Sequence, residues 1–536
     1  MIRKVGTAGY VSGVLNLVSV LSMTVACSSP DRPGFDSDDN RPSIPERARD
    51  KSANFLAGEC FTGDHPEGYA AECGRVVVAE GGEGSEAIDL AVMILYSKHE
   101  VPEDPVVYLE GGPGASGVSL GWYEPFPFAH ILEHRDLVLV DQRGTGYSKP
   151  SLTCRGNAET VDEELDGLDA CREDWEAEGV DFSQYNTRRN AADLDRVRQA
   201  LGYDRWNLYG ISYGSRLALT IARDFPATVR SMAIDGILPL QADLIADGVP
   251  SMAGSLEAVS AACQAQADCA ETYGDVDENL FRAVDELEAN PVELESGVML
   301  SGGLALSVIM QLLYSAKVLP YIPALVAGLR VKDFSLFEQM LSGGEEGPSF
   351  AVAMYYAVTC QDEAPFTSRA TVDAAREPFD ERYALAFDAR ILLEVCDRWN
   401  LPASPARENE VVESDVPSLV TSGSFDPVTP PAYGELAAAG LSNAQTFVLA
   451  DQSHGASVSR CGAELVTAFF DDPEQRLDPT CVDHLGAPSF RTGNRQALIT
   501  PPRLEFEVPV RWDAELVQRL VEAAKHARQR FPGPHW

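Results

Sequence analysis

Short apolar runs alternate with helical patterns through the first half of the chain. Several runs are apolar throughout, as expected for strands that are buried on both faces. The predicted strands are 75–78, 90–95, 106–109, 137–140, 206–209 and 231–234, and helical patterns occupy 191–201 and 215–223. Alternation of strands and helices predicts a mainly parallel sheet that is covered by helices.

The pattern changes after residue 240. Residues 241–400 are mostly helical in period, and strand patterns return at 419–421 and 446–449. Because a helical block separates two sheet segments, we expect an α/β fold with an inserted helical cap domain. Its two core parts are 56–240 and 401–536. Patterns for one more strand and one amphipathic helix lie at 504–508 and 514–528.

The N-terminal residues have the pattern of an export signal. Two basic residues precede an apolar run that ends at Ala26, and Cys27 follows. A basic start, a short apolar core and a small residue before the cleavage point predict a signal peptide at 1–26. Residues 27–55 are rich in Asp, Ser and Pro, which cannot bury a core, so we expect a flexible tether there.

A cysteine at the cleavage point followed by a polar tether resembles a bacterial lipoprotein, in which Cys27 becomes the lipidated first residue. Simple secretion and a retained N-terminal anchor are the alternatives. We therefore expect an exported protein, either a cell-envelope lipoprotein or a secreted one, with membrane contact only through Cys27. The later apolar stretch 302–329 is interrupted by polar residues and prolines and is not expected to span a membrane.

The cysteine count agrees with export. Of the 11 cysteines, ten remain when Cys27 is set aside, and an exported chain can keep local disulfides. Connectivity does not follow from sequence, so pairing of nearest neighbours is a hypothesis. It gives Cys60/Cys73, Cys154/Cys171, Cys263/Cys269, Cys360/Cys396 and Cys461/Cys481. Zinc is the competing interpretation, but there is no CxxC pair and the histidines are scattered, so no metal is expected.

The composition is that of an ordinary soluble protein with an acidic bias. The chain of 536 residues is 45% hydrophobic and 23% charged, which excludes disorder over its whole length. Acids outnumber bases 82 to 42, for a formal charge of −40. Without clustered basic residues, a nucleic-acid partner is not expected. The acidity either serves solubility or attracts cationic groups such as peptide amines.

The strongest local signal is Gly210-Ile211-Ser212-Tyr213-Gly214, between a predicted strand and a predicted helix. A nucleophilic serine on a tight strand-to-helix turn exposes Oγ, and the residues two away must be glycines for lack of space. The bare motif is common, but this context predicts that Ser212 is a nucleophile.

A second glycine-rich segment, Glu110-Gly111-Gly112-Pro113-Gly114, directly follows the predicted strand 106–109. Glycines let the backbone approach a substrate oxygen and point an N–H at it, and the backbone N–H of Tyr213 would supply the other donor of an oxyanion hole. An ordinary Gly-Pro turn is the alternative.

A hydroxyl nucleophile needs a base, and the base needs an orienting acid. His454 lies in a loop just after a predicted strand, where catalytic groups gather in open α/β sheets. Asp426 follows the preceding strand and precedes His454, in the expected order of serine, acid and histidine. Asp451 competes as the acid, and Asp426 could instead cap a turn. The other late histidines are His484, His526 and His535.

Together these motifs resemble the α/β-hydrolase peptidases of the prolyl iminopeptidase and tripeptidyl aminopeptidase group. The resemblance runs from about Cys60 to Cys481, and the last part is similar to the C-terminal region of the tripeptidyl aminopeptidases. It implies a triad of Ser212, Asp426 and His454, with Gly112 and Tyr213 as oxyanion donors. It also implies release of residues or short peptides from a free N-terminus, with no cofactor. It rests on residues 110–114, 141–148, 210–214, 423–430 and 454–455.

An aminopeptidase must also recognise a protonated amine, which requires a buried carboxylate. Asp362 is our first candidate and Glu363 the second, and both could instead be solvated loop charges. Glu110 is a further candidate because it adjoins the predicted oxyanion loop. An exported carboxylesterase on the same scaffold is the alternative function, and a non-enzymatic surface binding protein is a distant third.

Overall fold

The computed structural model describes residues 44–45, 51–61, 68–81, 85–98, 104–122, 126–154, 161–295, 297–341 and 350–492. The predicted signal peptide and Cys27 lie outside these residues. So do most of the predicted tether and the expected C-terminal strand and helix.

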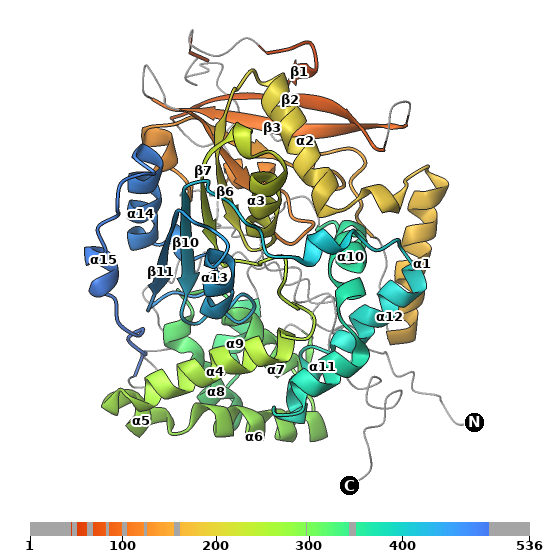
Figure 1. Ribbon diagram of the computed structural model, residues 1–536. Helices are drawn as coiled ribbons and strands as arrows, with labels where there is room; N and C mark the ends of the chain where they lie inside the picture. The colour runs from red at the N-terminus through yellow and green to blue at the C-terminus, as the bar shows by residue number, and fades with distance from the viewer. Residues whose placement is uncertain are drawn as a thin grey trace, which may run out of the picture.

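One sheet of nine strands organises the described part of the chain (Figure 1), in the order β1-β2-β3-β5-β4-β6-β7-β10-β11. The pairs β1–β2, β2–β3 and β3–β5 are antiparallel, and every pair from β5 through β11 is parallel. The strands are β1 (Phe55–Gly58), β2 (Ala70–Ala79), β3 (Ala87–Tyr96), β4 (Val106–Leu109), β5 (Leu137–Val140), β6 (Trp206–Ile211), β7 (Val229–Asp235), β10 (Ser418–Gly423) and β11 (Ala444–Leu449). The predicted mainly parallel sheet is confirmed.

Both faces of the sheet are buried, which explains why the central strands are apolar throughout. Successive residues of β6 enter opposite cores, with Leu208 on one side and Tyr209 on the other. Helices α2 (Thr187–Ala200) and α3 (Tyr213–Asp224) cover the first side, and α14 (Arg460–Asp471) covers the second.

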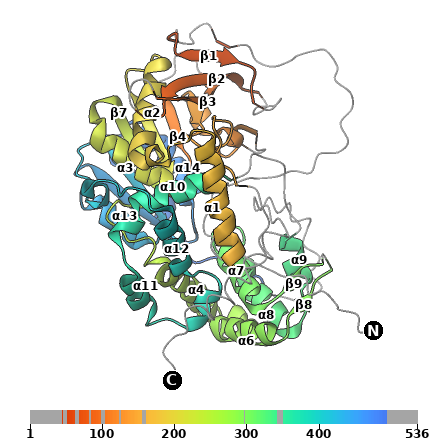
Figure 2. The ribbon, with the colours of Figure 1, turned by 90° about the vertical axis from the view of Figure 1, so that its right-hand side faces the viewer.

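A helical insertion separates β7 from β10 in the chain, as the sequence predicts. Figures 1 and 2 show these helices gathered beyond one end of the sheet. They are α4 (Gly248–Gln264), α5 (Ala267–Tyr273), α6 (Val276–Ala289), α7 (Gly302–Leu312), α8 (Ile322–Val331), α9 (Ser335–Leu341), α10 (Val352–Asp362), α11 (Arg369–Arg376) and α12 (Ala389–Trp399), with a small β8–β9 hairpin (Val292–Glu293 and Met299–Leu300). The fold is thus the α/β-hydrolase fold with an extra helical region.

Helix α1 (Val161–Ala177), which the sequence pattern did not predict, packs against the insertion (Figure 2). Arg398 of α12 forms ion pairs with Asp166 and Asp169 of α1 at 3.1 and 2.9 Å. Arg172 of α1 donates a hydrogen bond to the carbonyl of Trp399 at 2.7 Å. Helix α1, which belongs to the first core part, is therefore bonded to α12 of the insertion.

Five disulfides join the ten cysteines in the nearest-neighbour pairs of the sequence hypothesis. They are Cys60–Cys73, Cys154–Cys171, Cys263–Cys269, Cys360–Cys396 and Cys461–Cys481. Cys360–Cys396 links α10 to α12 within the insertion. Such a disulfide set indicates an extracytoplasmic protein. Within the described ranges, no helix has the length and hydropathy that crossing a membrane requires.

Candidate active site

Ser212 stands on a sharp turn between β6 and α3. Its φ of 58° and ψ of −127° are strained for a residue with a side chain, a conformation that persists only where the surroundings impose it. A Cβ on Gly210 would lie 2.3 Å from the carbonyl oxygen of Gly214, and a Cβ on Gly214 would lie 1.9 Å from that of Leu109. The turn therefore requires Gly210 because it is tight in itself, and it requires Gly214 because it packs closely against β4.

The histidine and the acid form a buried pair. Nδ1 of His454 lies 2.7 Å from Oδ2 of Asp426. The backbone N–H groups of Val428 and Thr429 donate to the other carboxylate oxygen at 2.9 Å each, and the Thr429 hydroxyl donates to Oδ2 at 2.8 Å. Asp426 therefore both caps its turn and orients the imidazole. The competing acid, Asp451, accepts a hydrogen bond from its neighbour Gln452 instead.

The other ring nitrogen of His454, Nε2, is buried and has no hydrogen-bond partner among the described residues. Burial alone would lower the pKa of His454, but the charges of Asp426 and Asp235 outweigh it and raise the pKa above its usual value. The ring of Tyr314 packs edge-on against the imidazole, with centroids 5.3 Å apart. A buried imidazole with one oriented nitrogen and one open nitrogen can accept a proton from a nearby hydroxyl.

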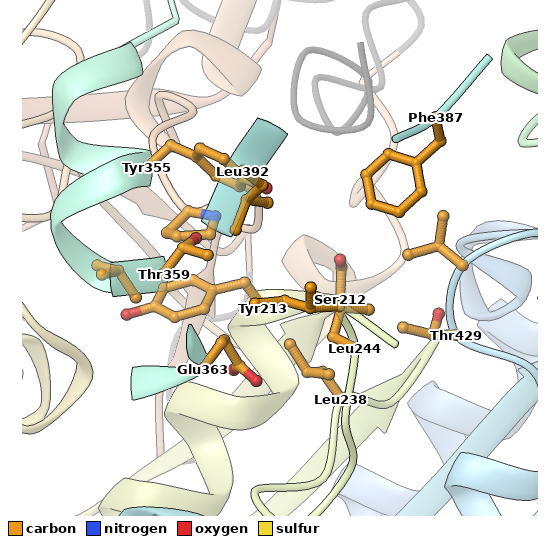
Figure 3. A pocket seen from close by; sticks show the side chains of 15 residues that line it. Ser212, Tyr213, Leu238, Leu244, Tyr355, Thr359, Glu363, Phe387, Leu392 and Thr429 are labelled. Carbon is orange, nitrogen blue, oxygen red and sulfur yellow. The ribbon is translucent and has the colours of Figure 1, made fainter. Parts of the chain in front are cut away.

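One pocket brings the glycine loop, the serine and the insertion together (Figure 3). Ser212 lines it with Gly112, Tyr213 and Thr429, and Thr429 is also 3.1 Å from Nδ1 of His454. The loop that contains Gly112 is held to the start of α10, since the N–H of Ala351 donates to the carbonyl of Gly114 at 3.0 Å. The remaining walls are mostly apolar: Pro113, Leu238, Leu244, Ile245, Tyr355, Val358, Thr359, Phe387, Leu392 and Val428, with Glu363 among them.

Asp362 and Glu363, the two acids at the end of α10, point to different surroundings, and this corrects our preference for Asp362. Asp362 does not line this pocket, because its carboxylate is saturated by the N–H of Thr187 at 2.8 Å and by the hydroxyls of Thr187 and Ser404. Glu363 does line it, and Arg216 of α3 forms an ion pair with it at 2.9 Å. Burial raises the pKa of Glu363 to about 7, with Arg216 opposing that shift.

Glu110 also lies off the pocket lining. Its side chain is buried behind the glycine loop, where Oε1 accepts from the N–H of Gly111 at 2.8 Å and Oε2 has no partner among the described residues. Burial, with repulsion from Asp141, raises the pKa of Glu110 to about 8. The carboxyl is therefore neutral near neutral pH and does not oppose negative charge in the pocket.

Sequence reasoning missed three side chains of the site. Thr429 lies within the quoted segment 423–430, and Arg216 comes one helical turn after Ser212, so local spacing could have suggested both. Tyr314 follows α7 in the insertion, and nothing in its local sequence connects it to His454.

A mainly parallel sheet with a strained serine between strand and helix, together with a buried histidine–aspartate pair, defines an α/β-hydrolase enzyme of the serine hydrolase class. Comparisons with known proteins agree with this class. Residues 104–266 match the alpha/beta hydrolase fold family, and residues 383–481 match the TAP-like protein family. The first segment contains Ser212, and the second contains Asp426 and His454.

The curated relatives are distant and include peptidases. The chain is 27% identical to the serine protease Hip1 of Mycobacterium tuberculosis over 367 residues, which is 60% of this chain and 69% of that protein. It is 31% identical to the proline iminopeptidase of Neisseria meningitidis over 138 residues, or 25% of this chain and 32% of that protein. Among solved structures it is similar to MGS-M2, an alpha/beta hydrolase enzyme from a deep-sea metagenome library, with 15% identity, a TM-score of 0.35, and coverage of 73% of this chain and 96% of that one.

Proposed function

We propose that this protein is an exported serine aminopeptidase that releases single residues or short peptides from free N-termini. Ser212 is the nucleophile, His454 the base and Asp426 the acid that orients it. The backbone N–H groups of Gly112 and Tyr213 receive the oxyanion. No cofactor takes part in this mechanism.

The reaction is a two-step acyl transfer. Oγ of Ser212 bonds to the scissile carbonyl carbon while its proton passes to Nε2 of His454, and Asp426 stabilises the imidazolium. His454 then gives that proton to the leaving amine as the C–N bond breaks. Water next attacks the acyl-enzyme, His454 takes its proton, and the released serine regains it.

The observation that carries the peptidase proposal is Glu363. A carboxylate in the wall of an otherwise mostly apolar pocket that the nucleophile also lines is suited to a protonated α-amine. Arg216 fixes the carboxylate from the same helix that begins at the nucleophile, so the amine site and Ser212 are rigidly related. The names of the distant relatives, a serine protease and proline iminopeptidases, support the same substrate class.

Export follows from the predicted signal peptide and is supported by the five disulfides. We propose that the mature protein is either attached to the cell envelope through lipidated Cys27 or secreted.

A carboxylesterase is the second candidate, because of the apolar walls of the pocket. Arg216 also neutralises part of the charge on Glu363, which weakens the argument for an amine. Substrates with and without a free amine distinguish the two functions.

The test is hydrolysis of a chromogenic panel by the mature protein and by Ser212→Ala. The panel contains free-amine tripeptide, dipeptide and single-residue anilides, an N-blocked tripeptide anilide and a short-chain ester. Ser212-dependent cleavage of free-amine anilides but not the blocked one supports the aminopeptidase and gives the number of residues released. Turnover of the ester alone assigns the carboxylesterase. If no substrate of the panel shows Ser212-dependent turnover, both candidate functions are contradicted.

A further inference from the structure

Asp235 is a fully buried carboxylate that lies outside the proposed triad. It is the last residue of β7, the strand that follows the one leading to Ser212. Its Oδ2 accepts hydrogen bonds from the N–H and the hydroxyl of Ser457 at 2.7 and 2.6 Å. Oδ1 is buried without a hydrogen-bond partner among the described residues.

Through these contacts Asp235 joins the two loops of the catalytic centre. Its backbone carbonyl accepts from the N–H of Ser212 at 3.0 Å, which fixes the nucleophile turn. Its carboxylate holds Ser457, which comes three residues after His454 on the same loop. Tyr209 of β6 also donates to the Ser457 hydroxyl at 2.8 Å, so Ser457 is bonded to two neighbouring strands, β6 and β7.

The residue after Asp235 brings the histidine ring against the same strand end. A Cβ on Gly236 would lie 3.1 Å from Cε1 and 3.2 Å from Nδ1 of His454. A side chain at this position would press on the imidazole, and the φ of 51° at Gly236 also favours glycine. The histidine ring therefore packs directly beside the strand end that carries Asp235.

The charged groups around this point are few. His454 is influenced by the carboxylates of Asp426 and Asp235, and Asp235 in turn by His454 and Asp426. The neighbouring Tyr108, Tyr209 and Tyr314 have raised pKa values because they are buried, so all three stay neutral. Among the described residues, no lysine or arginine forms an ion pair with Asp235, and an imidazolium at His454 is the cation its charge would stabilise.

We propose that Asp235 is a second acidic positioning residue of the catalytic centre. It fixes the His454 loop to β7 through Ser457, and its charge stabilises the imidazolium that forms when Ser212 loses its proton. The proposal rests on the proposed roles of Ser212 and His454 but on no particular substrate.

The experiment measures the rate of labelling by a fluorophosphonate as a function of pH. In this reaction Oγ of Ser212 bonds to phosphorus, fluoride leaves, and the serine proton passes to His454. Since the base must be neutral, the rate rises with pH through the pKa of His454. Loss of the Asp235 charge lowers that pKa. In Asp235→Asn we expect the acidic limb to move down by about one pH unit and the maximal rate to fall about tenfold.

Asp136→Asn is the matched control. Asp136 is also buried and also accepts from a backbone N–H, that of Ser97 at 2.8 Å. It directly precedes β5, however, so it lies at the opposite end of the parallel strands from Asp235. We expect this variant to leave the acidic limb unmoved. Ser457→Ala keeps the charge of Asp235 and removes one tether, so its maximal rate should fall about threefold with the limb in place.

An Asp235→Asn profile that coincides with that of the wild type overturns the proposal, as does a limb that moves equally in Asp136→Asn. If circular dichroism shows that Asp235→Asn does not fold, Ser457→Ala decides instead. A labelling rate in Ser457→Ala equal to that of the wild type then overturns the proposal. If the wild-type protein is not labelled, or if Ser212→Ala is labelled equally, the proposed triad fails, which is a different result.

Discussion

Glu363 and Arg216 form a buried ion pair at 2.9 Å that connects the helical insertion to the helix beginning at the nucleophile. Arg216 has further partners, since it donates to the carbonyls of Asp362 and Glu408 at 3.1 and 2.9 Å. The guanidinium is therefore held in place without Glu363, and the carboxylate can share its charge with a substrate amine.

Glu363→Gln should selectively weaken turnover of free-amine substrates. An amide cannot form the charge-assisted hydrogen bond that a carboxylate offers a protonated amine, a loss of about 1.5–3 kcal/mol. We expect kcat/KM for the best free-amine anilide to fall roughly 10- to 100-fold, while turnover of the short-chain ester stays near that of the wild type.

Asp362→Asn is the neighbouring control for this change. Its carboxylate is bound by Thr187 and Ser404 and not by substrate, so we expect lower stability but equal effects on amine and ester substrates. A loss restricted to free-amine substrates in Asp362→Asn, and absent from Glu363→Gln, would assign the amine to Asp362 after all.

The affinity for free-amine substrates should depend on pH in a narrow window. Burial raises the pKa of Glu363 to about 7, so the carboxylate that binds the amine is lost as the pH falls below that value. A peptide α-amine loses its own proton near about pH 8. We expect KM for a free-amine anilide to be lowest between these two values. KM of the ester should not rise at either end of this window. In Glu363→Gln, KM of the free-amine anilide should lack the rise below about pH 7.

Thr429 should be needed for full activity although it is not one of the triad residues. Its hydroxyl donates to Oδ2 of Asp426, the same oxygen that faces Nδ1 of His454. Thr429→Val preserves the shape but removes this donor, and we expect kcat to fall about tenfold or more because the pair loses its orientation. Thr429→Ser keeps the hydroxyl and should retain most of kcat. Equal activity of the two variants would contradict this role.

The sequence predicted the sheet, the inserted helices and the position of Ser212 well, because each of these depends on local patterns. The choice between Asp362 and Glu363 could not be made in this way. Neighbouring residues at a helix end point about 100° apart, so a shift of one residue decides which side chain enters the pocket. What separates them is Thr187, which is distant in sequence and reaches Asp362 only in the folded chain.

The Cys360–Cys396 disulfide should stabilise both the protein and its amine site. It closes a loop with a sequence separation of 36, for which chain entropy gives about 3–4 kcal/mol. Glu363 follows Cys360 by three positions. In the double variant Cys360→Ala/Cys396→Ala we expect a lower Tm by calorimetry and a KM increase larger for free-amine anilides than for the ester.

The control is Cys263→Ala/Cys269→Ala. This disulfide has a sequence separation of only 6 and joins α4 to α5. None of the residues in the loop that it closes lines the pocket, whereas Glu363 lies in the loop closed by Cys360–Cys396. It should lower Tm less and leave KM unchanged. An equal KM change in both double variants would indicate general loosening of the insertion.

Glu110→Gln should make the fold more stable, and increasingly so as the pH rises. In the folded state the pKa of Glu110 is raised to about 8 from an ordinary value of 4.5, chiefly by burial. Between these values the unfolded chain ionises while the folded chain keeps its proton, so wild-type stability falls as the pH rises. The full penalty is on the order of 5 kcal/mol above about pH 8, and a glutamine at this position does not have this penalty.

Urea unfolding of both proteins from about pH 4 to about pH 9 measures the difference directly. We expect the two free energies of unfolding to be similar at the acidic end and to diverge in favour of Glu110→Gln through neutral pH. Glu80→Gln is the control, because Glu80 is also buried but its Oε1 accepts hydrogen bonds from the N–H of Asp181 and the hydroxyl of Tyr185, so this change should not stabilise the fold. A constant difference between Glu110→Gln and the wild type at every pH would mean that Glu110 is ionised in the fold, and its neutrality behind the glycine loop would then be wrong.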